Sequence, residues 1–182
     1  MATYIESGLC LDLPDGQHFR FADLPAYKTL SGQHLKEMDF AWINGGKLFL
    51  LEVRSYAQVS TTLTGADFVP VTGHPAPHRY LALIEKVTDS LLMMLASWAG
   101  STCGQSIRDA LPTGAKKRLP MKLVIAVDLP AHLAIHLQGL RDSLNDRLRG
   151  RIALADVSSV VLIDYARLVA NPMFSAFIKK QP

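Results

Sequence analysis

Hydrophobic and polar positions form their clearest pattern between residues 36 and 58. Two apolar segments, 38–43 and 47–53, flank the sequence Asn-Gly-Gly at 44–46. Glycine readily adopts the positive φ angles of a tight turn, so this pattern predicts a β-hairpin. Two shorter apolar arms around Pro-Asp-Gly at 14–16 predict another hairpin before it, and together the N-terminal hairpins are expected to span residues 4–54.

The pattern changes in the second half of the chain. Residues 55–77 lack a period and are rich in Thr, Gly and Pro, which predicts a long loop, whereas apolar residues at helical spacing predict a central packed helix over 78–98. Within 121–164, two continuous apolar runs on either side of an amphipathic segment predict strand, helix and strand. The tail, 165–182, is expected to be helical and broken at Pro172.

This order of elements predicts an α/β fold with a mixed central sheet. A strand–helix–strand unit places its two strands in parallel, while the hairpins pair antiparallel. The chain has 182 residues, of which 49% are hydrophobic, enough for one domain with its own core and short for two. We therefore expect one domain, 1–182.

The charge is modest, and its distribution is more informative than its total. The formal net charge is +3, too small by itself to indicate a polyanionic partner. Lys116, Lys117 and Arg118 form a local basic cluster that can contact a nucleic-acid backbone, and the alternative is a solvated surface cluster.

Two cysteines, Cys10 and Cys103, lie far apart in the sequence. Reduced thiols are therefore expected, and the absence of a secretory-type N-terminal segment favours a cytoplasmic location. The longest apolar run is too short for a membrane span, so we expect no membrane association.

The hairpin brings acidic residues together. If its two glycines are the central turn residues, Asp39 faces Glu52 and Glu37 faces Arg54 on the neighbouring strand. Facing side chains lie about 5 Å apart at Cβ, and two carboxylates at that distance repel each other. A bound cation, a basic side chain or a raised pKa would relieve the repulsion, and a carboxylate pair suits Mg²⁺.

The same register predicts which face of the hairpin is apolar. Asp39, Glu52 and Arg54 are expected to share one face. The opposite face is expected to cover the central helix and carries Phe40, Trp42, Phe49, Leu51 and Val53.

The order of motif and elements resembles that of the PD-(D/E)XK nuclease superfamily. In that family an acidic residue on one strand is followed by a hairpin and by an apolar strand that ends in Glu-x-Lys, and then by helix, strand, helix and strand. The matching residues are Asp39, Glu52 and, at the lysine position, Arg54. The resemblance implies a restriction-endonuclease-like fold and Mg²⁺ held by Asp39 and Glu52. It also implies phosphodiester hydrolysis in nucleic acid, chiefly DNA, in restriction, defence or repair, and a homodimer where both strands are cut. Arg54 would then contact a phosphate, and residues 116–118 would grip the backbone.

The sequence departs from the family pattern in two places. No proline precedes Asp39, and Arg54 replaces a lysine that can lose its proton, which arginine does not do. Lys86 on the predicted helix can take the missing position, although a surface charge beside Glu85 is the simpler interpretation. A further acid is common in the family, and only Glu6 is placed for that part.

Other interpretations remain open. An ion-pair cluster of Glu37, Glu52 and Arg54 would neutralise the acids without metal, as in an inactive accessory subunit that binds DNA or partner proteins. The apolar segments 68–71 and 173–177 would then be protein-facing surface. A small-molecule enzyme of the α/β class is a third alternative.

Two further sets of polar residues have spacings that metal or ligand sites use. His132 and His136 have an i, i+4 spacing that can present two imidazoles to zinc, against a helix-surface interpretation. Asp128 and Asp164 end the two predicted buried strands, where parallel sheets often bind ligands.

Overall fold

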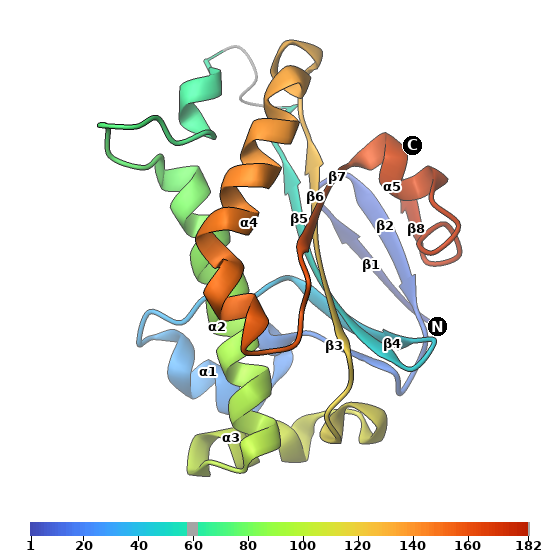
Figure 1. The fold of residues 1–182 in the computed structure, drawn as a ribbon. Coiled ribbons are helices and arrows are strands. Elements are labelled where there is room, and N and C mark those ends of the chain that lie inside the picture. The colour runs from blue at the N-terminus through green and yellow to red at the C-terminus, as the bar shows by residue number, and fades with distance from the viewer. Residues whose placement is uncertain (58–61, 182) are drawn as a thin grey trace.

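A five-stranded mixed sheet forms the centre of the protein (Figure 1). The structure is a computed structural model and describes residues 1–57 and 62–181. The strand order is β3-β4-β5-β6-β7, with β3 and β4 antiparallel to their neighbours and β5, β6 and β7 parallel to one another. These strands are β3 (His18–Phe19), β4 (Phe40–Asn44), β5 (Lys47–Ser55), β6 (Met121–Asp128) and β7 (Val160–Asp164). A mixed sheet of the α/β class is thus confirmed.

Helices cover one face of this sheet (Figure 1). Leu48 and Leu50 of β5 point into a core that also contains Leu83 and Val87 from the long central helix. The elements of this side are α1 (Pro25–Ser31), α2 (His78–Ala99), α3 (Thr102–Ala110) and α4 (Leu137–Ala153). The central helix was predicted to within one residue at its C-terminal end, whereas α1 was not predicted.

A second, antiparallel sheet covers the opposite face (Figure 1). Its order is β1-β2-β8, and the short helix α5 lies beside it. These elements are β1 (Ala2–Glu6), β2 (Leu9–Leu13), α5 (Tyr165–Ala170) and β8 (Ile178–Lys180). The predicted helical tail is thus helical over α5, before Pro172, and forms the strand β8 instead of a second helix after it.

The first hairpin differs from its prediction. The chain does turn at Pro14, since Gln17 N donates to its carbonyl oxygen at 3.2 Å. However, the arms on either side enter different sheets, and the true hairpin joins β1 and β2 through Ser7 and Gly8, both at positive φ. The prediction was wrong because a turn signal fixes a change of direction and leaves the pairing partner open.

The prediction that the apolar face of the β4–β5 hairpin packs on the central helix was also wrong. The five residues named above for that face pack against the second sheet, including Leu9, Leu11 and Leu13, instead of the central helix. The helix covers the other face, the one that carries Glu52 and Arg54. Glu52 and Arg54 of the hairpin therefore face α2, which also carries polar side chains on the side that faces the sheet. Within the two described ranges, no helix has the length and apolar character to cross a membrane.

Candidate functional site

The β4–β5 hairpin places Asp39 beside Glu52. Asn44 pairs with Lys47 and Phe40 with Leu51, as predicted, so one step further outward Asp39 faces Glu52. Val53 N donates to Asp39 Oδ2 at 2.8 Å, which fixes this carboxylate at the start of β4. Glu52 is completely buried. The acidic pair predicted from the turn is therefore present in the fold.

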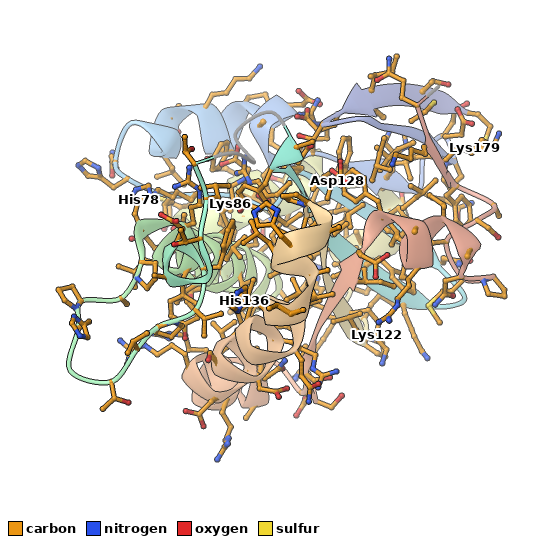
Figure 2. All side chains as sticks on the ribbon, turned by 90° about the horizontal axis from the view of Figure 1, so that it is seen from above. His78, Lys86, Lys122, Asp128, His136 and Lys179 are labelled. Carbon is orange, nitrogen blue, oxygen red and sulfur yellow. The ribbon has the colours of Figure 1, made fainter. Side chains whose placement is uncertain are left out.

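Lys86 of α2, labelled in Figure 2, lies between the two acids. Its Nζ is 3.1 Å from Asp39 Oδ1 and 2.9 Å from Glu52 Oε1, and only 14% of the side chain is exposed. Glu85, its neighbour in the sequence, pairs with Lys36 instead. The interpretation of Lys86 as a surface charge beside Glu85 was thus wrong, because this position on α2 faces the sheet.

Arg54 also pairs with Glu52. Its Nε lies 2.6 Å from Glu52 Oε1, although this oxygen accepts no correctly aligned hydrogen bond from any described residue. The expected contact of Arg54 with Glu37 is not formed, because Glu37 lies before β4 and accepts a hydrogen bond from the hydroxyl of Tyr27. The cluster therefore has two acids and two basic residues, Lys86 and Arg54.

Burial dominates the ionisation of Glu52. It raises the pKa of the carboxyl from 4.5 to about 8, with a further rise from Asp39 and opposing effects from Lys86 and Arg54. The ionised form is therefore costly in this apolar position. Any cation that enters between Asp39 and Glu52 would favour the ionised form and lower this pKa.

Asp39 and Glu52 fit a magnesium ion as a minimal site. Mg²⁺ is commonly held by one or two carboxylates and keeps several water ligands, and in this structure Oε1 of Glu52 instead has Arg54 Nε at 2.6 Å and Lys86 Nζ at 2.9 Å. In the part of the chain that the structure describes, no group of three or more His, Cys, Asp or Glu side chains is arranged around a metal position. Glu6 does not join the pair: its carboxylate lies 3.9 Å from Arg20, which donates to the backbone oxygen of Asp39.

The basic cluster at 116–118 lies far from the acids. It lines a cavity of about 520 Å³ together with Trp98, near the end of α2, and Lys86 is twelve residues earlier on that helix. At 1.5 Å per residue, this separation is roughly 18 Å along the helix axis. Lys116 donates to the backbone oxygen of Asp109 and Arg118 pairs with Asp156. The expectation that this cluster and Arg54 contact neighbouring parts of one short nucleic-acid segment is therefore not supported by their positions.

The two histidines form no zinc site in the structure. His132 and His136 lie in a 3-10 helix, Ala131–His136, where an i, i+4 pair does not share a face. His136 packs against Gly65, where an added Cβ would lie 2.5 Å from its ring. The ring thus packs against the segment that precedes α2.

The two strand-end aspartates have structural partners. Asp128, labelled in Figure 2, accepts a hydrogen bond from Ser55 Oγ at 3.3 Å. Asp164 caps the N-terminus of α5 through Arg167 N.

The apolar segments proposed as protein-facing surface each bury one aromatic side chain and leave other residues exposed. Phe68 is 2% exposed and its ring meets that of Tyr56 at 4.8 Å, and Phe174 is 4% exposed in the core between the sheets. Val71 and Met173 alone among the large apolar side chains of these two segments are exposed.

Comparison with known proteins gave no match: no family model, no curated protein and no solved structure is similar to this chain. The geometry of Asp39, Glu52 and Lys86 is therefore the main guide to function.

Proposed function

We propose that this protein hydrolyses phosphodiester bonds in nucleic acid, and DNA in particular, with Mg²⁺ held by Asp39 and Glu52. The observation that carries the proposal is the position of Lys86 Nζ, 3.1 Å from one acid and 2.9 Å from the other. An ammonium group thus stands beside the acidic pair, although the sequence has arginine where the Glu-x-Lys signature has lysine. A defence, restriction or repair role accords with this activity.

Each polar group has a distinct part in this proposal. Hydrolysis joins a water oxygen to phosphorus, breaks one P–O ester bond and delivers a proton to the leaving oxygen. Mg²⁺, when bound, polarises the phosphate and lowers the pKa of its water. Lys86 stabilises charge that develops on the phosphate oxygens, and its amine can exchange a proton, whereas Arg54 keeps a fixed positive charge for the phosphate.

The proposal is tested by cleavage of plasmid DNA with Mg²⁺ or Mn²⁺. We expect cleavage by the unmodified protein and its loss in Asp39→Asn and in Glu52→Gln. The matched control is Glu85→Gln, which removes an exposed carboxylate one residue before Lys86 and should cleave normally. Equal cleavage by Glu52→Gln and Glu85→Gln would show that the nuclease activity lies elsewhere.

A second candidate is an inactive nuclease-fold subunit that binds DNA or partner proteins. It is favoured by the fully buried carboxylate of Glu52 and by the two basic side chains that already neutralise the acids. This candidate predicts no cleavage with either metal and DNA or protein binding that survives Glu52→Gln. Metal-dependent cleavage that Glu52→Gln abolishes would exclude it.

A further inference from the structure

A small cavity lies next to the acidic pair, between the end of β5 and the start of α2. Its volume is about 240 Å³. Two of its residues, His78 and Lys86, are labelled in Figure 2. Its lining consists of Arg54, Tyr56, His78, Arg79, Ala82, Leu83 and Lys86.

The charged side chains that line this cavity are all basic. Arg54, Arg79 and Lys86 line it, and the acids in contact with them are Asp39 and Glu52. The lining itself carries these three cations and no acid, and Asp67 acts on Arg79 from outside the lining. The cavity is therefore suited to an anion.

Arg79 is the cation of this group that pairs with neither Asp39 nor Glu52. Burial raises the pKa of the Tyr56 hydroxyl, and Arg54 and Arg79 oppose the rise, so both guanidinium groups act on that hydroxyl. Within residues 1–57 and 62–181 Arg79 has no carboxylate at ion-pair distance, although its charge lowers the pKa of Asp67. A guanidinium and a hydroxyl on one wall are the donors that phosphate oxygens accept.

The N-terminus of α2 adds to the positive electrostatic potential at this cavity. His78 and Arg79 are the first two residues of this 22-residue helix, and its N-cap, Pro77, supplies no capping side chain. The N-terminus of a helix carries a partial positive charge and free amide donors, which favour a bound anion.

The size of the cavity limits the anion. Pockets for drug-sized ligands run from about 300 to 1,000 Å³, so about 240 Å³ admits a phosphate with part of a sugar and excludes a base pair. Ala82 and Leu83 contribute an apolar wall. A phosphate monoester carries up to two negative charges and interacts more strongly with the three cations of the lining than an internal diester, which carries one.

We propose that this cavity binds the terminal phosphate of a nucleic-acid strand and so presents the end nucleotide to Asp39 and Glu52. The inference rests on the proposed function for its class of substrate. Arg54 and Lys86 contact the acids and also line the cavity, so a phosphate held there lies next to the acidic pair. The protein would then act on phosphorylated ends.

The test is a binding measurement in EDTA, where no cleavage occurs. Fluorescence anisotropy compares one short single-stranded oligonucleotide with a 5′-phosphate, with a 3′-phosphate and with hydroxyls at both ends. We expect one phosphorylated form to bind about tenfold tighter than the hydroxyl form, the size of a charge-assisted hydrogen bond or two. Equal affinity for all three would overturn the proposal.

Variants assign the preference to the cavity. Arg79→Gln should abolish it, and Tyr56→Phe, which keeps the ring contact with Phe68, should weaken it. Arg151→Gln removes an exposed arginine at the far end of α4 and should retain the full preference. A preference that persists in Arg79→Gln would place the phosphate site elsewhere and overturn the proposal.

Competition distinguishes the source of the phosphate. Inorganic phosphate and a mononucleotide should compete only weakly with the phosphorylated oligonucleotide. If either binds as tightly as that oligonucleotide, the ligand is a small phosphate compound, and the proposal that the cavity binds a strand end is overturned. An end preference without any cleavage would refute only the proposed activity, and cleavage without an end preference would refute only the inference.

Discussion

The buried Glu52 carboxyl should make the stability of the metal-free protein depend on pH. Its pKa is about 8 in the folded protein, against 4.5 for the ordinary group. Between these values the folded state binds a proton that the unfolded state has lost. The contribution of Glu52 to the free energy of unfolding is therefore complete below pH 4.5 and is lost as the pH rises through 8.

The magnitude follows from the size of the shift. One pKa unit corresponds to about 1.4 kcal/mol, so a rise from 4.5 to about 8 corresponds to roughly 5 kcal/mol in all. Integrating the same linkage between pH 5.5 and pH 8 gives about 3 kcal/mol. Replacement by glutamine keeps the shape of the side chain and removes the titration.

The assay is urea unfolding of the unmodified protein and of Glu52→Gln in EDTA at pH 5.5 and pH 8. We expect the unmodified protein to lose about 3 kcal/mol relative to Glu52→Gln between the two pH values. Glu85→Gln, at an exposed carboxylate on α2, should follow the unmodified protein. A constant difference between the unmodified protein and Glu52→Gln would refute the reasoning and show Glu52 to be ionised throughout as an ion pair with Lys86.

Three further predictions concern other parts of the structure. Lys86→Met leaves two facing carboxylates without their shared ammonium, and we expect a loss of about 3 kcal/mol in urea unfolding at pH 8, together with loss of Mg²⁺-dependent cleavage. Gly45→Ala places a Cβ at φ +54° in the β4–β5 turn, and we expect a fall of about 1–2 kcal/mol in the free energy of unfolding. The double change Lys117→Gln and Arg118→Gln should reduce the salt dependence of binding to long duplex DNA, and it should leave cleavage of a short oligonucleotide unchanged because the cluster lies roughly 18 Å from Lys86 along α2.

The register of the β4–β5 hairpin could be predicted because local chemistry determines it. Gly45 and Gly46 both adopt positive φ, and this restricts the turn to a two-residue loop. The position of Asp39 opposite Glu52 then follows by counting. The parallel strands were likewise predictable, since the apolar run in β6 is buried on both faces.

What covers each face could not be predicted, because it depends on contacts between distant segments. The apolar residues of the hairpin are satisfied equally well by a helix or by a second sheet, and the structure uses Leu9, Leu11 and Leu13 of β2. The position of Lys86 depends on that same choice. Lys86 lies between Ile84 and Val87, which face the core, and the sequence therefore does not show whether its side chain points to solvent or to the sheet. The packing of α2 on the sheet shows that Lys86 contacts the acids.

The arrangement of charges suggests how a neutralised acidic pair can still accept a metal ion. Arg54 and Lys86 each contact Glu52 and also line the phosphate cavity. An anion bound in that cavity therefore competes with the acids for the two cations. As those contacts weaken, the carboxylates regain the negative charge density that Mg²⁺ needs, and a bound cation in turn favours the anion. Phosphate and Mg²⁺ should therefore each raise the affinity of the other by the same factor, as thermodynamic linkage requires. A neutralised cluster in the absence of substrate is thus compatible with the proposed nuclease activity, because a bound phosphate would draw Arg54 and Lys86 away from Glu52.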